Sequence, residues 1–140
     1  MFSTNRRLAS VCLVIAAGLP LAGCGSSSPT APPPAPVVLL DTTVPLTDGV
    51  NCTVGYVGAE FTGTAGTTVA ISATGAANLT PLFILYAPDF ATQLATSSAR
   101  GAGAASLTYA LTQAGLHHLS ICDVNGVAGT LRVTVQQQPK

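Results

Sequence analysis

Residues 82–89 read Leu82-Phe83-Ile84-Leu85-Tyr86-Ala87-Pro88-Asp89 and form the stretch that decides the fold. Leu82–Tyr86 is apolar at every position, which is typical of a strand inside a sheet that is covered on both faces. Ala87-Pro88-Asp89 then favours a turn, because proline and aspartate are common turn residues. The stretch therefore predicts a central β-strand that ends in a turn.

The segments on either side alternate between apolar and small or polar residues, which is the period of a half-buried strand. Clusters of glycine, proline, asparagine and aspartate separate them, and no stretch has helical spacing. Seven or eight short strands in about 100 residues predict an all-β fold, an antiparallel β-sandwich or jelly roll. Besides Leu82–Tyr86, the candidate strands are Val69–Ala73, Leu107–Leu111, Leu116–Cys122, Leu131–Val135 and, more weakly, Val37–Leu46 and Val54–Phe61.

Composition and charge exclude several classes of protein. The chain has 140 residues, of which 48% are hydrophobic and 7% charged, and its formal net charge is zero. This length suits one domain and argues against a large multi-domain enzyme. The charge argues against a nucleic-acid binder with a basic face. Residues 37–135 carry two arginines and five acidic residues, a formal charge of −3, which also disfavours adhesion to an anionic membrane.

The first 21 residues have the pattern of a secretory signal. Arg6 and Arg7 give a positive start without any acid, and Leu8–Leu21 is almost wholly apolar. A helix of about fourteen residues rises ~21 Å, short of a hydrocarbon core of ~30 Å. A positive region followed by a short apolar region and small residues predicts a cleaved leader rather than a membrane span.

Leu21-Ala22-Gly23-Cys24 resembles the lipobox of bacterial lipoprotein signal peptides. The resemblance implies cleavage before Cys24, so that residues 1–23 are the signal peptide and Cys24 is the first mature residue. It also implies that Cys24 carries a diacylglyceryl thioether and an N-acyl chain such as palmitate. Two or more acyl chains anchor a protein stably. The expected location is the bacterial cell envelope, at the outer membrane or cell surface, with the lipid bilayer as partner.

Residues 24–36 are expected to form a tether between the lipid and a folded body. Gly25–Pro36 reads GSSSPTAPPPAP, which has no periodicity and too few large apolar residues to fold. Proline biases it towards extended polyproline II, in which twelve residues reach roughly 37 Å. A ligand for a proline-recognition domain is the alternative for this stretch. The β-sandwich is then expected over residues 37–135, and residues 136–140 are a tail.

Several stretches of the body resemble bacterial pre-peptidase C-terminal (PPC) domains in their order and spacing. The resemblance implies a compact β-sandwich, usually appended to secreted hydrolases and given binding or maturation roles. This sequence departs from the family pattern at His117-His118, where aromatic residues are common, and at Phe90, where the turn usually has glycine. Most acidic residues of the calcium-binding relatives are also missing. The stretches are Phe61–Ile71, Leu82–Asp89, Leu107–Gly115, Leu119–Ile121 and Asp123–Val135.

The sequence offers few candidates for catalysis or metal binding. His117 and His118 are adjacent on a predicted strand, so they point to opposite faces and cannot chelate one metal together. Asp89 and Asp123 could belong to a weak calcium site, although Ca²⁺ takes 6–8 oxygen ligands. Asn125-Gly126 is more typical of a hairpin turn. There is no GxSxG nucleophile motif. We therefore expect no catalytic residue, no metal and no cofactor.

The four cysteines predict one disulfide. Cys12 leaves with the leader and Cys24 is used by the lipid, so Cys52 and Cys122 remain in a compartment where disulfides persist. Two buried free thiols are the alternative. We expect the bond to join the two ends of the sandwich, because Cys52 lies near the start of an early strand and Cys122 in a late one.

These features predict a membrane-anchored envelope lipoprotein with a non-catalytic β-sandwich module. The module would bind a glycan or an envelope protein, or serve a structural role. The alternative is a small envelope hydrolase, or a protease-associated or inhibitory module. A shallow surface with exposed Tyr or Phe would favour glycan binding, whereas a pocket with paired carboxylates and a histidine would favour an enzyme.

Overall fold

The structure is a computed structural model that describes residues 31–49, 51–99 and 103–140. The chain divides into two units, Met1–Ala31 and Pro32–Lys140. The proposed leader, Cys24 and the first part of the tether lie outside the described residues. The second unit contains every strand described below.

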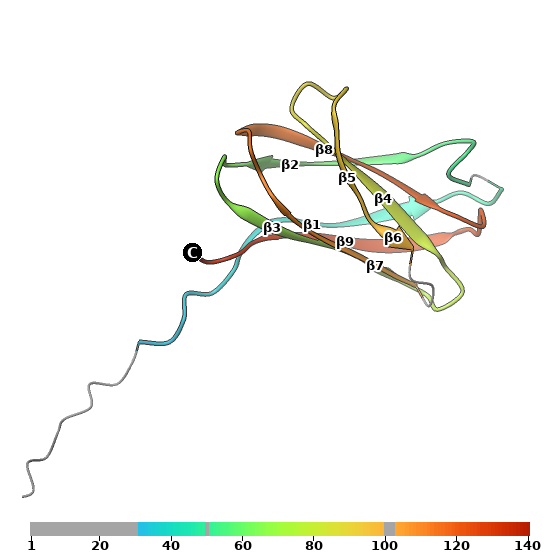
Figure 1. Cartoon of the computed structure of the whole chain (residues 1–140). Coiled ribbons are helices and arrows are strands. Elements are labelled where there is room, and N and C mark those ends of the chain that lie inside the picture. The colour runs from blue at the N-terminus through green and yellow to red at the C-terminus, as the bar shows by residue number, and fades with distance from the viewer. Residues whose placement is uncertain (1–30, 50, 100–102) are drawn as a thin grey trace, which may run out of the picture. The chain divides into compact units, whose positions relative to one another are not determined.

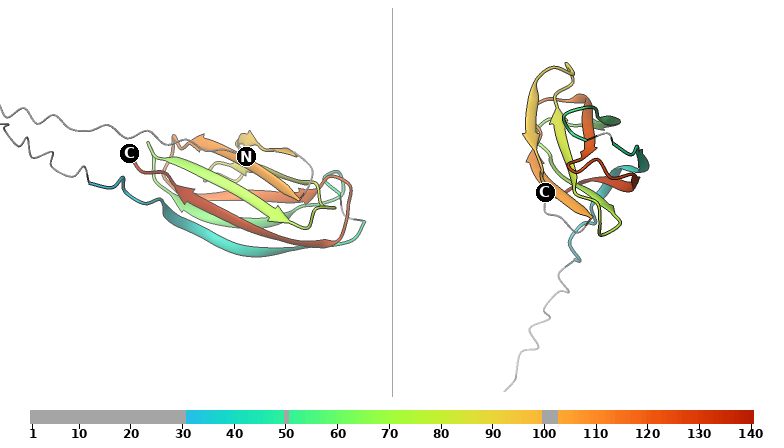
Figure 2. Two further views of the ribbon diagram at one scale, coloured as in Figure 1. Left: turned by 90° about the horizontal axis from the view of Figure 1, so that it is seen from below. Right: turned by 90° about the vertical axis from the view of Figure 1, so that its right-hand side faces the viewer.

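Within the described residues, nine strands form two antiparallel sheets that pack face to face (Figures 1 and 2). The five-stranded sheet has the order β1-β9-β3-β7-β6, and the four-stranded sheet has the order β2-β8-β4-β5. The all-β sandwich predicted from the sequence is thereby confirmed. The strands are β1 Val37–Leu46, β2 Val57–Gly63, β3 Thr68–Gly75, β4 Pro81–Tyr86, β5 Gln93–Thr96, β6 Ser98–Ala99, β7 Ala104–Ala110, β8 Gly115–Asp123 and β9 Gly129–Gln137.

The sequence did not predict β5 and β6, which carry the chain from one sheet to the other. Ser97 stands between them and is buried. Its N–H donates to the carbonyl oxygen of Phe83 at 2.9 Å, and its Oγ accepts from the N–H of Phe83 at 2.9 Å. A strand that changes sheets makes a corner of the sandwich. Here the serine side chain completes the pairing with β4 at that corner.

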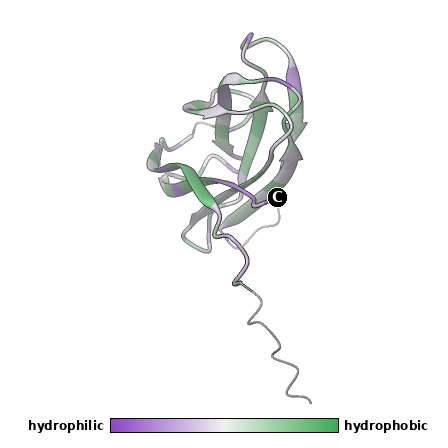
Figure 3. Ribbon diagram, turned by 90° about the vertical axis from the view of Figure 1, so that its left-hand side faces the viewer, coloured by the Kyte–Doolittle hydropathy of each residue, from purple (hydrophilic) through white to green (hydrophobic). Residues whose placement is uncertain are grey.

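The core lies between the sheets and is made by alternate residues of each strand. In β3, Val69, Ile71 and Ala73 are buried while the residues between them are half-buried. Figure 3 shows hydrophobic and hydrophilic stretches along the strands. The alternation explains the apolar composition, because both sheets contribute one apolar face. The largest fully buried side chains include Phe83, Ile71, Leu79, Leu85, Leu111, Leu119, Ile121 and Leu131.

The expectation that β4 is covered on both faces is wrong. β4 lies inside its sheet, between β8 and β5, as expected. However, Phe83 and Leu85 are buried in the core, whereas Leu82, Ile84 and Tyr86 on the opposite face are only half-buried. Nothing among the described residues forms a third layer over this outer face. The apolar side chains there therefore belong to a surface.

The described residues contain no helix that is long and apolar enough to cross a membrane.

Candidate functional site

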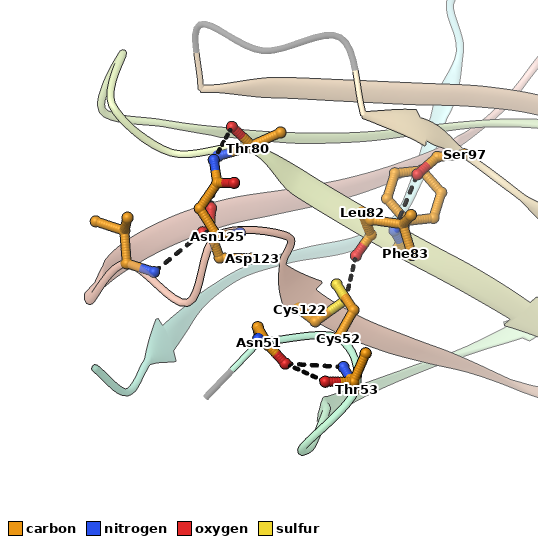
Figure 4. The surroundings of a disulfide bond; sticks show 11 residues. Asn51, Cys52, Thr53, Thr80, Leu82, Phe83, Ser97, Cys122, Asp123 and Asn125 are labelled. Carbon is orange, nitrogen blue, oxygen red and sulfur yellow. Dashed lines mark hydrogen bonds between the residues drawn. A yellow bond between two sulfur atoms is a disulfide. The ribbon is translucent and has the colours of Figure 1, made fainter. Parts of the chain in front are cut away.

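The predicted disulfide joins Cys52, in the loop between β1 and β2, to Cys122 near the end of β8 (Figure 4). The two Cα atoms are 5.2 Å apart. The bond closes one end of the sandwich, so the expectation that it joins the two ends is wrong. Because β2 and β8 are antiparallel, with Val57 opposite Ile121, the start of β2 and the end of β8 lie at the same end.

Further contacts hold this loop beside the disulfide. Asn51 pairs with Asp123 in an isolated parallel bridge. The side-chain oxygen of Asn51 accepts hydrogen bonds from the N–H and hydroxyl of Thr53 at 3.0 and 2.6 Å. The N–H of Gly49 donates to the carbonyl oxygen of Gly126 at 2.9 Å. The disulfide therefore reinforces a loop that also has its own hydrogen bonds.

Asp123 organises the turn after β8. It is fully buried, and its carboxylate accepts hydrogen bonds from the backbone N–H groups of Thr80, Asn125 and Val127. The last two are 2.9 and 3.0 Å long. The Asn125 amide also donates to the Thr80 hydroxyl at 3.0 Å, as Figure 4 shows. Asp123 thus ties the β8–β9 turn to the start of β4.

Asp89 has a comparable role at the other end of β4. Its carboxylate accepts from the N–H groups of Ala91 and Thr92 at 3.0 and 2.8 Å, and from the Thr92 hydroxyl. The Thr92 hydroxyl bond, followed by the backbone bonds, lowers the pKa of Asp89 below its ordinary value. β4 pairs with β8 from Pro81–Asp123 to Tyr86–His118. Asp123 therefore lies opposite the first residue of β4, whereas Asp89 lies in the turn after its last residue. The two carboxylates therefore do not lie together where they could bind one calcium ion.

His117 and His118 point to opposite faces, as predicted. His117 is fully buried and stacks on Phe61, with ring centroids 5.4 Å apart and an angle of 14° between the planes. Its Nδ1 lies 3.1 Å from the carbonyl oxygen of Gly115, and its Nε2 has no hydrogen-bond partner. This imidazole belongs to the core and cannot reach a substrate.

His118 lies in a row of side chains across the outer face of the four-stranded sheet. It is opposite Glu60 of β2 on one side and Tyr86 of β4 on the other. Its Nδ1 is 3.6 Å from Oε1 of Glu60. Gly58 makes room for the ring, because a Cβ at that residue would lie 2.8 Å from Cε1 of His118. The three side chains come from three strands and meet only through the sheet register.

Phe90 adds a second aromatic ring to this row from the β4–β5 turn. The ring centroid of Phe90 is 5.6 Å from that of His118. The ring centroid of Tyr86 is 6.3 Å from that of His118. Phe90 is 48% exposed and has a φ of +57°, in the left-handed region. We call Glu60, Tyr86, Phe90 and His118 the aromatic platform. No pocket opens on it or elsewhere among the described residues.

The platform has the chemistry of a contact surface. It offers aromatic faces, one imidazole and one carboxylate side by side. In the described part of the chain, no hydroxyl or thiol donates a hydrogen bond to either imidazole, and no three metal-ligating side chains gather. A nucleophilic mechanism needs a nucleophile beside its base. The arrangement instead places partly exposed aromatic rings beside one carboxylate.

Sequence reasoning did not single out Glu60 or Tyr86 as site residues. The sequence pattern predicts Tyr86 in a strand that is buried on both faces and Glu60 in a weaker strand, without a role for either. Phe90 carried a signal, because an aromatic residue stands where a turn favours glycine. The cross-strand register that gathers these residues was not readable from the sequence, because it depends on pairing between distant segments.

No family model matches the chain, and no curated protein matches it either. Among solved structures, the pre-peptidase C-terminal domain of collagenase from Bacillus anthracis is similar, with a TM-score of 0.54 and 17% sequence identity. The similarity covers 76% of this chain and 98% of that domain. It supports the PPC resemblance at the level of the fold.

Proposed function

We propose that this protein is a lipid-anchored lipoprotein of the bacterial envelope whose β-sandwich is a non-catalytic binding module. The observation that carries the proposal is the order of three segments along the chain. A lipobox-like Leu21–Cys24 ends a short apolar leader, Gly25–Pro36 follows as a proline-rich tether, and β1 then begins the sandwich at Val37. This order suits a folded module held at a membrane surface.

The tether would hold the sandwich clear of the lipid headgroups. An extended polyproline II segment of twelve residues reaches roughly 37 Å. The acyl chains of the diacylglyceryl group and of the N-terminus of Cys24 would supply stable anchoring without a membrane-spanning helix. The outer membrane or the cell surface is the proposed location, and the lipid bilayer is the first partner.

Binding is favoured over catalysis by the roles that the polar residues already have. His117 is in the core, and Asp89 and Asp123 each hold a turn through several hydrogen bonds. His118 remains accessible, but its near neighbours are Glu60 and aromatic rings. A partly exposed group of aromatic rings beside a carboxylate suits recognition of a second molecule, a glycan or an envelope protein.

The intact mass of the protein purified from its own envelope tests the anchor. We expect a chain that begins at Cys24 and carries the added mass of a diacylglyceryl group and an acyl chain. The Cys24→Ser variant should lack that mass and stay in the precursor form. A wild-type chain that still begins at Met1, or one without acyl mass, would contradict the proposal.

A second measurement tests the non-catalytic role. We expect neither the wild-type protein nor the His118→Ala variant to hydrolyse an envelope substrate. The melting temperature of the variant should stay close to that of the wild type, because the His118 ring is partly exposed. If the wild type hydrolyses an envelope substrate and the folded variant does not, the protein is an envelope hydrolase and the proposal of a non-catalytic module is wrong.

A further inference from the structure

Phe90 occupies a backbone conformation and a location that both disfavour phenylalanine. A φ of +57° lies in the left-handed region, where a bulky residue is an outlier and glycine is the usual occupant. The side chain is also 48% exposed to solvent. Glycine would relieve the backbone and remove the exposed apolar area. Backbone strain of this kind is found preferentially at functional sites.

The turn holds Phe90 firmly in this conformation. The N–H of Phe90 donates to the carbonyl oxygen of Ala87 at 2.9 Å, and the N–H of Ala87 donates to that of Thr92 at 2.9 Å. The Asp89 carboxylate accepts three further hydrogen bonds from the same turn. The backbone of Phe90 is therefore fixed at the edge of the platform before any ligand arrives. Such preorganisation reduces the entropy lost on binding.

The charge around the platform is negative. Glu60 is about half-exposed, and the faces of aromatic rings carry the negative end of a quadrupole. Of the cationic side chains that the structure describes, Arg132 pairs with Asp41 on the five-stranded sheet, with N–O distances of 2.9 and 2.7 Å. The other, Lys140, is the last residue. The platform is thus complementary to a positively charged ligand.

We infer that the aromatic platform binds an arginine side chain of a partner protein. A guanidinium group is planar, stacks on aromatic faces and pairs with a carboxylate through two parallel hydrogen bonds. The planes of the Phe90 and His118 rings are tilted by 50° to each other, so the guanidinium would stack on the face of one of them while its N–H groups reach Glu60. Leu116, 42% exposed and two residues before His118 on β8, offers an apolar contact beside it. The inference rests on the proposed binding role and is independent of the lipid anchor.

A peptide titration followed by NMR tests the inference on the mature chain, residues 24–140 with Cys24→Ser. The probe is a capped pentapeptide that alternates glycine with arginine, in low-salt buffer. Its control replaces arginine with citrulline, which has the same shape without the charge. We expect amide shifts at the four platform residues and binding about tenfold weaker for citrulline, from the loss of ion pairing and cation–π contact.

Variants separate binding from folding. Phe90→Gly should lose most of the peptide affinity while its melting temperature stays equal to or above that of the wild type, because the backbone strain is relieved. Glu60→Gln should weaken the arginine peptide and leave the citrulline peptide unchanged. Thr108→Ala, on the outer face of the five-stranded sheet, is the matched control and should bind like the wild type.

Several results would overturn the inference. One is that the arginine peptide causes no amide shifts at the platform residues, and another is that it and the citrulline peptide bind with equal affinity. A third is that both Phe90→Gly and Glu60→Gln keep the full affinity of the wild type for the arginine peptide. A neutral oligosaccharide of β-1,4-linked N-acetylglucosamine that shifts the platform residues when the arginine peptide does not would identify a glycan surface instead. None of these results bears on the acyl mass at Cys24, so a failure of the anchor would be recognised separately.

Discussion

Removal of the Cys52–Cys122 disulfide should lower the stability of the sandwich substantially without changing its fold. The bond links residues 70 positions apart. The hydrogen bond from Gly49 to Gly126 and the bridge between Asn51 and Asp123 do not depend on the sulfur atoms. The folded loop should therefore persist after the bond is removed, and the effect should arise mainly in the unfolded chain.

The magnitude follows from the length of the loop that the bond closes. Closing a loop of 70 residues removes chain entropy worth about 4 kcal/mol at 25 °C. This is a large share of the ~5–15 kcal/mol by which a domain is usually stable. For a domain of about 100 residues, 1 kcal/mol corresponds to at least ~4 °C in melting temperature. We therefore expect the melting temperature to fall by roughly 15 °C.

Thermal unfolding followed by circular dichroism measures the change. The samples are the oxidised protein, the protein kept reduced and the double variant Cys52→Ala/Cys122→Ala. Cys122 is only 2% exposed, so alanine there also leaves a small cavity, whereas the reduced protein keeps both sulfur atoms. A fall of less than about 4 °C in the reduced protein would mean that the bond contributes less than about 1 kcal/mol. That result would refute the loop-entropy argument.

Three further predictions follow from single contacts. Asp123→Asn should lower the free energy of unfolding by about 3 kcal/mol. The reason is that the amide nitrogen of asparagine cannot accept the hydrogen bond that a carboxylate oxygen accepts from a backbone N–H. Chemical denaturation measures the change, and a loss below about 1 kcal/mol would contradict the prediction. Gly103→Ala should lower the melting temperature far more than Gly66→Ala, since both glycines have φ above +70° but only the Cβ at Gly103 would run into backbone carbonyls; equal melts would disprove the steric reason. Thr92→Val should raise the pKa of Asp89 because it removes the hydrogen bond that lowers it most. The lowered pKa of Asp89 stabilises the fold at pH values above the ordinary value of 3.8, and this stabilisation is lost as the pH falls through the pKa of the folded state. The variant should therefore lose the stabilisation at a higher pH than the wild type. An unchanged NMR titration of Asp89 would count against this.

The strands that the sequence predicted are those whose pattern is local. In Leu131–Val135 and Val69–Ala73, apolar residues recur at every second position, and this alternation is the same wherever the strand lies in the sheet. Gln93–Thr96 and Ser98–Ala99 lack such a pattern, because they are short and rich in small or polar residues. They are strands because β4 and β7 offer them hydrogen-bonding partners.

The wrong expectation that β4 is buried on both faces also comes from reasoning on periodicity. Leu82–Tyr86 is apolar at both parities, which periodicity alone interprets as burial on both faces. In the sandwich only Phe83 and Leu85 enter the core, and Leu82, Ile84 and Tyr86 remain at the outer surface. An apolar residue on a sheet face is buried only if another layer covers that face. The absence of a cover among the described residues turns part of β4 into a candidate binding surface.

Composition and periodicity along the chain predicted a leader, a tether and an all-β body, of which the structure describes the body. Elimination among the four cysteines selected Cys52 and Cys122 as disulfide partners. These features depend on near neighbours in the sequence, or on counting. The tertiary structure alone decided that the disulfide closes one end of the sandwich and that Glu60, His118 and Tyr86 stand side by side. It also brought Phe90 to His118 by folding a turn into the left-handed region. The reason is that the register of antiparallel strands is set by long-range pairing and core packing, and a shift of one residue would have sent His118 inward and His117 outward.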